Sequence, residues 1–373
     1  MTEERKAPAI RFKEFSGQNA EAWEQRKLEE VVEVNSGKDY KHLSTGTIPV
    51  YGTGGYMLSV SESLSDVDGI GIGRKGTIDK PYILKAPFWT VDTLFYCIPK
   101  DANNLYFVYS VFNNVTWKNL DESTGVPSLS KITINNIQSF FPTPPEQRVI
   151  GSFFQELDQL ITLQQRKLEK SRRIKKAMLQ KMFPGNKQTV PAIRFKEFSG
   201  VAWKKWKLEE VADRFDNLRI PVSANKRKSG SIPYYGANGI QDYVDGYTHD
   251  GEYVLIAEDG ANDLKDYPIQ YVNGKVWVNN HAHVVQGRSK MVDTKFLAFA
   301  MKQINFKPYL VGGGRAKLNA DIMMKLPLKL PTPPEQRAIG SFFQDLDKFI
   351  TLQQCRLDKL QNMKKALLEQ MMM

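Results

Sequence analysis

The sequence predicts an α+β protein made of two similar globular halves, each followed by a long helix. Two repeats predict this organisation. Residues 143–165 recur as 332–354, and the copies differ at only four pairs of positions: Val149/Ala338, Glu156/Asp345, Gln159/Lys348 and Leu160/Phe349. Residues 8–17 recur unchanged as 191–200. By contrast, 57–130 and 241–318 share little, although both are rich in strand-like segments. The chain therefore has an internal pseudo-two-fold repeat with variable middles.

Each long helix begins with the motif Thr-Pro-Pro-Glu-Gln-Arg. Thr143 is expected to be the N-cap, whose hydroxyl accepts a hydrogen bond from the first turn. Pro144 suits the first helical position, where a missing N–H costs nothing. Glu146 is expected to complete a capping box. No proline follows before Pro184, so the helix can run for about 40 residues, or about 60 Å. A helix of that length predicts a coiled coil.

These motifs set the expected domain boundaries. We predict globular domains at 1–141 and 186–330, a central helix with a linker at 142–185, and a C-terminal helix at 331–373. Short helices are expected at 28–34, 105–113, 208–215 and 294–303. Strands are expected at 70–73, 82–84, 89–98, 253–256, 268–272 and 275–285, with Gly and Asp marking the turns between them.

Composition narrows the class of protein. The 373 residues carry a formal net charge of +11, and the pI is about 9.3. A basic balance of this size favours an anionic partner. No run of 18 apolar residues occurs, which argues against a membrane span. The two cysteines, Cys97 and Cys355, lie in unrelated segments and fit a reducing compartment. We expect a cytoplasmic protein without membrane contact.

The sequence contains no recognisable enzyme motif. It has no GxxxxGK[ST] phosphate loop, no Asn-Pro-Pro-Tyr methylation motif and no HExxH or Cys/His metal cluster. Gly71 and Gly73 superficially resemble a dinucleotide-binding turn, but no crossover helix follows them. We therefore expect no catalytic residue, no metal and no cofactor in this chain.

Two paired motifs identify a family resemblance. PTPPEQR-x-IGSFFQ-x-LD-x-x-ITLQQ follows each variable half, and W-x-x-x-KLEEV opens each half at Trp23 and Trp203. Together they resemble the specificity subunit of a type I restriction-modification system, over essentially the full length. The resemblance implies that each variable half is a target recognition domain that reads one part of a split, asymmetric DNA sequence. It implies that the long helices form an antiparallel coiled coil that spaces these domains.

The resemblance also implies partners. Two methyltransferase subunits would dock on the helices, joined by restriction subunits when the system cuts. S-adenosylmethionine, ATP and Mg²⁺ would be bound by those partners. The repeat pattern agrees, because near-identical helices present one surface twice, whereas different loops on one framework read two different targets. Recent duplication is an alternative that does not explain why the middles diverged more. A coiled-coil scaffold without sequence-specific DNA binding, and a system that only methylates, also stay open.

Candidate DNA contacts are loop residues suited to phosphates or base edges. In the first half they are Tyr51, Thr53, Arg74, Lys75, Thr77, Ser128, Ser130 and Lys131. In the second half they are Tyr235, Asn238, Asn262, Asn280, His281, Arg315 and Lys317. The turn 258–262 aligns with the Arg74 turn but is acidic, so it cannot bind phosphate directly, although Asn262 can pair with adenine. His283 is expected to pack in a strand. An ordinary surface turn is the alternative for every loop.

Candidate helix contacts, either in the coiled coil or with a partner, are Phe153, Phe154, Leu157, Gln164, Phe342, Phe343, Leu346 and Gln353. The phenylalanines exceed what one narrow seam needs, so some should pack on the globular halves or on a partner. Gln164 and Gln353 stand at equivalent positions where an apolar seam residue is expected. We predict that they lie close together and that this polar pair fixes the register of the helices. The alternative is that both are exposed.

Overall fold

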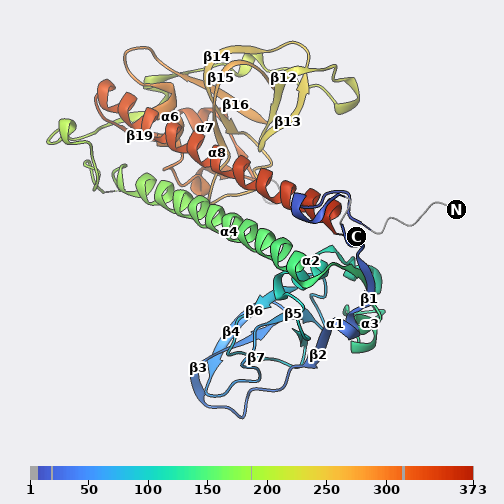
Figure 1. Ribbon diagram of the computed structural model, residues 1–373. Coiled ribbons are helices and arrows are strands. Elements are labelled where there is room, and N and C mark those ends of the chain that lie inside the picture. The colour runs from blue at the N-terminus through green and yellow to red at the C-terminus, as the bar shows by residue number, and fades with distance from the viewer. Residues whose placement is uncertain (1–6, 18–19, 186, 313–315, 373) are drawn as a thin grey trace. The chain divides into compact units, whose positions relative to one another are not determined.

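The computed structural model describes residues 7–17, 20–185, 187–312 and 316–372. The chain forms two compact units (Figure 1). Unit 1 comprises Met1–Arg166 and Cys355–Met373, and unit 2 comprises Lys167–Gln354. Each unit therefore contains one globular half, the first part of one long helix and the last part of the other. The boundaries expected from sequence keep each helix whole, whereas the compact units divide both helices near their middles.

Unit 1 is an α+β structure around strands that are antiparallel except for the parallel pair β3 and β7. Its sheets have the orders β2-β8-β5-β6, β4-β3-β7 and β1-β9. The strands are β1 (Glu24–Lys27), β2 (Val32–Ser36), β3 (Thr45–Gly52), β4 (Gly55–Val60), β5 (Gly69–Gly73), β6 (Tyr82–Leu84), β7 (Trp89–Thr90), β8 (Leu94–Pro99) and β9 (Gln138–Phe141). The helices are α1 (Leu28–Val31), α2 (Leu105–Asn114), α3 (Lys131–Asn135) and the long α4 (Pro144–Lys181), with 3-10 turns at Lys13–Phe15 and Trp117–Leu120.

Unit 2 repeats this plan with a larger sheet, of order β11-β16-β14-β15-β12-β13, and two small ladders, β10-β19 and β17-β18. The strands are β10 (Lys204–Lys207), β11 (Ala212–Arg214), β12 (Ser229–Gly236), β13 (Gly239–Val244), β14 (His249–Ala257), β15 (Ile269–Val278), β16 (Ala282–Gly287), β17 (Leu310–Val311), β18 (Lys317–Leu318) and β19 (Pro327–Leu330). The helices are α5 (Leu208–Val211), α6 (Thr294–Met301), α7 (Ala320–Met324) and the long α8 (Pro333–Met371), with 3-10 turns at Lys196–Phe198, Asp216–Leu218, Ala224–Lys226 and Lys307–Tyr309.

Three expectations about local structure are wrong. The helices expected at 28–34 and 208–215 end at Val31 and Val211, after which the chain extends into β2 and β11. β-branched, alternating residues such as Val32 and Val34 favour a strand there. The strand expected at 89–98 is two strands, β7 and β8. The strands expected at 268–272 and 275–285 are divided after Val278 instead, so β15 is long and continuous.

The two units differ because of a proline. In unit 1 the strand leaving β6 is interrupted at Pro87, which has no N–H for a ladder hydrogen bond. Its counterpart in unit 2, β15, pairs with β14 at one end and with β12 at the other. One continuous strand therefore joins into a single sheet what unit 1 divides into two.

The start of each long helix is fixed by a buried ion pair. Glu146 was expected to cap its own helix, but its carboxylate accepts two hydrogen bonds from the Arg11 guanidinium, each 2.6 Å long. Arg194 binds Glu335 identically, also at 2.6 Å twice. The side chains of both pairs are almost fully buried, with 8% of each arginine and 0% of each glutamate exposed.

These arginines belong to the unchanged repeats 8–17 and 191–200, which we call the clasp segments. Besides the ion pair, each clasp segment hydrogen bonds to the end of a long helix. The Ile10 N–H donates to the Gln370 carbonyl in unit 1, and the Ile193 N–H donates to the Lys181 carbonyl in unit 2. Each clasp segment therefore connects the first turn of one long helix to the last turn of the other.

The next motif residue, Gln147, joins the helix start to α2. Its side-chain oxygen accepts from the backbone N–H of Asn104, the N-cap of α2, and its nitrogen donates to the Pro142 carbonyl. A Cβ on Gly151 would lie 2.2 Å from Asn104 Oδ1 and 2.8 Å from the Phe107 nitrogen. Only glycine at this position allows α2 to begin so close to α4.

Within each unit the two helix parts contact one another and bury a seam with alternating three- and four-residue spacing. In unit 1 the Lys364 ammonium lies 2.5 Å from the Asp158 carboxylate. In unit 2 Lys175 pairs with Asp347. The most buried seam residues on α4 are Ile150, Phe154, Leu157, Ile161, Gln164, Leu168 and Ser171. This spacing is the 3.5-residue period of a coiled coil.

Gln164 and Gln353 both lie in this seam and are not exposed. Only 8% of Gln164 and 5% of Gln353 is accessible to solvent. The two residues belong to different units, so their predicted pairing stays a prediction.

The buried ion pair can be tested by removing one partner. Arg11→Ala leaves the Glu146 carboxylate buried without its counter-ion, which typically costs about 3–5 kcal/mol. We expect the free energy of unfolding of unit 1, measured in guanidinium, to fall by that amount. Arg11→Met combined with Glu146→Leu should recover most of the loss, because an apolar pair has no desolvation cost.

Arg26→Ala serves as the matched control. It removes a partly exposed pair with Glu30 at 3.5 Å, and such pairs contribute at most about 1 kcal/mol. Equal effects of Arg11→Ala and Arg26→Ala would show that the clasp is a surface contact and not a structural one.

Candidate nucleic-acid interface

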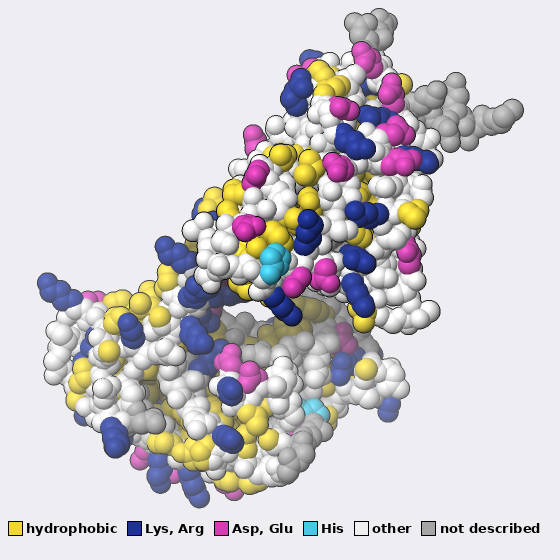
Figure 2. Space-filling model, turned by 90° about the horizontal axis from the view of Figure 1, so that it is seen from below, with side chains coloured by type: hydrophobic (Ala, Val, Ile, Leu, Met, Phe, Trp, Pro, Cys, Tyr) yellow, Lys and Arg dark blue, Asp and Glu magenta, His cyan; other side chains and the backbone are white. Residues whose placement is uncertain are grey.

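Basic side chains are not gathered in one patch on the face of the molecule that Figure 2 shows. On the face shown in Figure 2, Lys and Arg side chains are interspersed with Asp and Glu over both units. The formal charge of +11 therefore does not locate an interface by itself. The loops that the structure brings together are more informative.

In unit 1, three separate loops meet at one edge, which we call the first loop edge (51–56, 74–77 and 126–130). Lys75 and Ser128 form an isolated antiparallel bridge. The Leu129 N–H donates to the Arg74 carbonyl at 2.9 Å, and the Gly76 N–H donates to the Pro127 carbonyl at 2.8 Å. The loop 51–56 also reaches this edge, since a Cβ on Gly76 would lie 3.8 Å from Thr53 Oγ1.

The first loop edge presents cations to solvent. Arg74 and Lys75 are exposed, and Thr77 is partly exposed. Among the described residues, the Arg74 side chain makes a 3.4 Å contact with the Asp92 carbonyl and a 5.8 Å approach to the Phe95 ring, and no ion pair. Lys75 makes no ion pair within the described part of the chain. Both cations are therefore available to a phosphate or to a guanine edge.

Other predicted residues of this edge have structural partners. Ser130 is the N-cap of α3, where its hydroxyl oxygen accepts from the Thr133 N–H at 3.1 Å and donates to Glu122 at 2.9 Å. Lys131 is the first residue of α3 and is partly exposed. Tyr51 packs against the ring of Tyr56, 6.4 Å away between centroids. These residues shape the edge more than they present free groups.

Unit 2 assembles the equivalent edge with the same backbone contacts. We call it the second loop edge (235–239, 258–262, 279–281 and 316–318). Asp259 and Lys317 form the isolated bridge that corresponds to Lys75 and Ser128. The Leu318 N–H donates to the Glu258 carbonyl at 2.7 Å, which is the counterpart of the Leu129–Arg74 bond. The alignment of the acidic turn with the Arg74 turn is therefore structural. Arg315 lies outside the described residues.

Asparagines connect the turns of the second loop edge. Asn238 Nδ2 donates to the Gly260 carbonyl, and the Asn262 N–H donates to Asn238 Oδ1, both at 2.9 Å. The side-chain amide of Asn262 is exposed and makes no hydrogen bond among the described residues. Asn280 is also exposed, and Tyr235 is partly buried. Asn262 is the residue best placed to pair with adenine.

The acidic turn is neutralised from within the unit. Glu258 lies 2.7 Å from the Arg219 guanidinium and 3.1 Å from the Lys317 ammonium. Burial alone would raise the pKa of Glu258, but hydrogen bonds from Arg219 and Lys317 outweigh it, and the pKa is lowered. The carboxylate is therefore ionised and already paired, which leaves it little capacity to read cytosine N4. It also explains how acidic residues are tolerated at this edge.

The two histidines expected in a single strand have different environments, because His281 lies in the turn before β16 and only His283 lies in a strand. His283 is buried, as expected, and its ring nitrogens lie 2.7 Å from Asp216 and 2.8 Å from the Leu318 carbonyl. It joins β16 to the loop edge. His281 is partly exposed, with Nδ1 lying 2.6 Å from Asp259.

Sequence analysis missed Arg219, which pairs with Glu258 across 39 residues of sequence. No short motif signals such a pair. It also missed a set of apolar residues exposed on the long helices at equivalent positions. These are Leu160 and Phe349, Leu163 and Leu352, and Ile174 and Met363.

The predicted helix residues mostly pack within their own unit. Phe153 contacts Phe12 of the clasp segment, 5.7 Å between ring centroids, and Phe342 contacts Phe195 at 6.1 Å. Phe343 packs on Phe299 of α6 at 5.1 Å. Phe154 and Leu157 are buried in the seam, and Leu346 is partly buried there.

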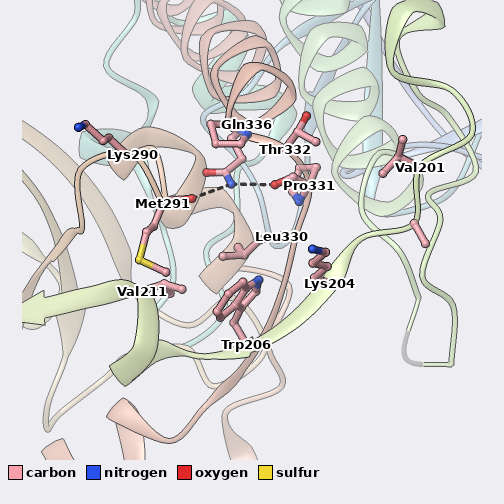
Figure 3. Close-up of a pocket in the computed structure, with 12 residues that line it drawn as sticks. Val201, Lys204, Trp206, Val211, Lys290, Met291, Leu330, Pro331, Thr332 and Gln336 are labelled. Atoms are coloured by element: carbon pink, nitrogen blue, oxygen red, sulfur yellow. Dashed lines mark hydrogen bonds between the residues drawn. The ribbon is translucent and has the colours of Figure 1, made fainter.

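A cleft of about 290 Å³ lies at the start of α8 (Figure 3). Gln336 points across it and donates to the carbonyls of Met291 at 3.1 Å and Pro331 at 2.9 Å. None of the predicted DNA contacts lines this cleft. Its polar groups hold the helix start in place, as Gln147 does in unit 1.

Within the described ranges, no group of three or more His, Cys, Asp or Glu side chains is arranged to hold a metal ion. No helix in that part of the chain is long and apolar enough to span a membrane. Cys97 is buried, and burial raises the pKa of its thiol, whereas Cys355 is exposed.

The duplicated design matches a known family. The family described as Type I restriction modification DNA specificity domain matches the chain twice, over residues 20–171 and 200–362. The chain belongs to this family. Each match covers one globular half and most of the following long helix, so the family pattern repeats where the structure repeats.

Three relatives illustrate the range of similarity. A putative type I restriction enzyme specificity subunit of Haemophilus influenzae is 51% identical over 135 residues, which is 36% of this chain and 34% of that protein. The MjaVIII specificity subunit of Methanocaldococcus jannaschii is 23% identical over 72% of this chain and 69% of its own length. The crystal structure of a type I S subunit from M. genitalium has the same fold, with a TM-score of 0.77, 15% identity and 98% coverage of both chains. The chain thus spans about a third of the H. influenzae relative.

The paired state of Glu258 predicts a pH dependence. Its folded pKa is lowered from the ordinary 4.5, so the ionised carboxylate stabilises unit 2 fully above about pH 4.5. That contribution is lost as the pH falls through the folded pKa. Glu258→Gln should therefore cost about 1.5–3 kcal/mol at pH 7 and progressively less in acid, as measured by urea unfolding at several pH values.

Asp250→Asn, an exposed position on the neighbouring strand β14, is the control and should not show this loss in acid. A Glu258→Gln defect that is equally large at neutral and acidic pH would mean that packing, rather than charge, is responsible.

Proposed function

We propose that this chain is the DNA sequence-specificity subunit of a type I restriction-modification complex, without catalytic activity of its own. The observation that carries the proposal is the pair of loop edges. The Leu129–Arg74 and Leu318–Glu258 backbone bonds build the same edge in both units, and the side chains presented there differ. One backbone framework that presents two different sets of side chains suits a bipartite, asymmetric DNA target.

The proposed division of labour follows from the groups at each edge. Arg74 and Lys75 of the first loop edge suit phosphate oxygens and guanine O6 and N7, whereas the Asn262 amide suits adenine N6 and N7. Phosphate contacts supply most of the affinity and base-edge contacts supply the specificity. Adenine methylation requires extrusion of the base from the duplex, and that step, with S-adenosylmethionine, belongs to partner subunits in this proposal.

The helices are proposed to dock two copies of a methyltransferase subunit, with restriction subunits joining through them. Leu163 and Leu352 are 48% and 49% exposed at equivalent positions. Leu160 and Phe349 repeat the pattern one turn earlier. The same apolar surface presented twice supports two identical partners, because an exposed apolar side chain that repeats in both copies is a plausible contact for one type of surface.

Genome-wide adenine methylation tests the recognition role. In cells that carry this chain and its candidate methyltransferase subunits, we expect a motif of two short blocks around a fixed gap. Arg74→Ala with Lys75→Ala should affect only the first block, and Asn262→Ala should relax one position of the other, because a bidentate contact discriminates bases by about 1–3 kcal/mol. Methylation that persists unchanged when the chain is deleted would instead favour a scaffold that binds only proteins.

Partner stoichiometry tests the docking role. Leu163→Ser and Leu352→Ser should each reduce the number of bound methyltransferase subunits from two to one, and the double variant should bind none, as measured by native mass spectrometry. Thr162→Ala and Thr351→Ala, which are exposed neighbours one residue earlier on each helix, provide the controls. Two partners bound to the double leucine variant would place the docking surface elsewhere.

A further inference from the structure

A basic cleft in unit 2 lies outside both loop edges. Its volume is about 310 Å³, and it opens between the start of β12, the end of β13 and β15. Three consecutive cationic residues, Lys226, Arg227 and Lys228, line it together with the aromatic rings of Tyr234 and Trp277. No loop that was assigned to sequence reading contributes to it.

Unit 1 has a corresponding site, where β3 and β7 pair as β12 and β15 do, but apolar side chains fill it. Trp89 and Val50 pair across parallel strands as Trp277 and Tyr234 do. Each indole N–H donates to a backbone carbonyl, Lys38 for Trp89 at 2.9 Å and Ile220 for Trp277 at 2.7 Å.

The side chains at this site in unit 1 are apolar. Val50, Val60, Trp89 and Val91 form a buried cluster with Leu43 packed against it. The aligned segments STGTIP and KSGSIP place Arg227 where unit 1 has Leu43. The basic lining is therefore a feature of unit 2 and not of the shared framework.

The cations of the cleft are differently constrained. Arg227 stacks over Tyr234, with its Cζ 4.1 Å from the ring centroid, and its Nη1 lies 3.4 Å from the Asp242 carboxylate. Lys226 and Lys228 are exposed and form no ion pair within the described ranges. Asp245 also lines the cleft. The balance of three cations against two carboxylates leaves a net positive charge with two free ammonium groups.

A further cation extends the cleft along the sheet. Lys275 stands two residues before Trp277 on β15, so both side chains point to the same face. Its ammonium lies 4.7 Å from the Tyr247 ring centroid. Lys275 therefore adds a cation on the face of the sheet that carries Trp277 of the cleft.

Among the residues that the structure describes, the second loop edge has few cations that are not already paired. Arg219 and Lys317 both pair with Glu258, and His281 contacts Asp259. The first loop edge, by contrast, presents Arg74 and Lys75. If unit 2 is to bind duplex DNA with comparable strength, cations beyond those described at the second loop edge must contribute phosphate contacts.

We propose that the cleft formed by Lys226, Arg227, Lys228 and Trp277 is a phosphate-binding site for the DNA backbone that flanks the bases read by the second loop edge. The inference rests on the proposed function and adds to it a site without sequence preference. Trp277 precedes Asn280 by three residues, which span at most about 10 Å along the chain. That upper limit equals about three base pairs at 3.4 Å each.

The test uses the full chain bound to its methyltransferase subunits and a labelled duplex with the methylated motif. Dissociation constants are measured over a series of salt concentrations. Each phosphate contact contributes about 0.9 to the slope of log K against log salt. Lys226→Ala with Lys228→Ala should therefore reduce the slope by about 1.8, on motif and unrelated duplexes alike, without changing the methylated motif.

Three controls test whether the effect is specific to the cleft, whether the variant protein folds, and which part of the duplex the cleft contacts. Lys38→Ala with Lys41→Ala changes exposed lysines in the corresponding segment of unit 1 and should leave the slope unchanged. Arg227→Leu restores the residue type that unit 1 has there, so it should fold and still weaken binding. A duplex that ends at the last base of the second block should bind wild type and the double lysine variant equally.

The outcomes separate the two proposals. If wild type binds the duplex but the cleft variant keeps the same salt slope, the phosphate site is wrong and the recognition function stands. If the variant changes the methylated motif, the cleft reads bases and the phosphate assignment also fails. If the wild-type complex shows no salt-dependent duplex binding at all, the recognition function itself is overturned.

Discussion

The buried arginine–glutamate pair at the start of each long helix is the interaction on which the design depends. Arg11 and Glu146, like Arg194 and Glu335, bind with two 2.6 Å hydrogen bonds in nearly complete burial. Burying two charges is costly unless both are fully paired, so the geometry admits little variation. Because each arginine lies in a clasp segment that also contacts the far end of the other helix, one pair fixes three parts of a unit. The variable loops can then change without moving the helices.

That rigid frame explains why the two edges share backbone contacts but not chemistry. The carbonyl of residue 74 or 258 accepts the same bond in either unit, whatever side chain the residue carries. An arginine in unit 1 and a glutamate in unit 2 therefore occupy equivalent backbone positions with opposite charge. The glutamate is stable only because Arg219 and Lys317 reach it. Changing the chemistry of one loop thus required changes in two others, which are distant in sequence and adjacent in space.

Much of the fold follows from the sequence because the repeats report it directly. The helix starts and the equivalence of the two halves are predictable from the spacing of the repeats, whereas the contact between the turns near 74 and 128 is known only from the structure. The ion pair of Glu146 with Arg11 is not predictable in this way, because the same Thr-x-x-Glu pattern also predicts a capping box. The role of Ser130 as an N-cap was hidden because hydroxyls suit both caps and phosphates. Arg219 and the cleft at Trp277 depend on long-range pairing, which local patterns do not encode.

The two units also distribute positive charge differently, and this bears on how affinity and specificity are separated. In unit 1 the exposed Arg74 and Lys75 lie in one turn of the first loop edge, so under the proposed function a change there would alter both the affinity for DNA and the choice of bases. In unit 2 Arg219 and Lys317 neutralise Glu258, and the exposed Lys226 and Lys228 line the cleft beside Trp277. Electrostatic attraction to phosphate carries no sequence information. If the cleft binds phosphate as proposed, changes at the second loop edge would alter the target sequence of unit 2 and leave most of its attraction to DNA in place.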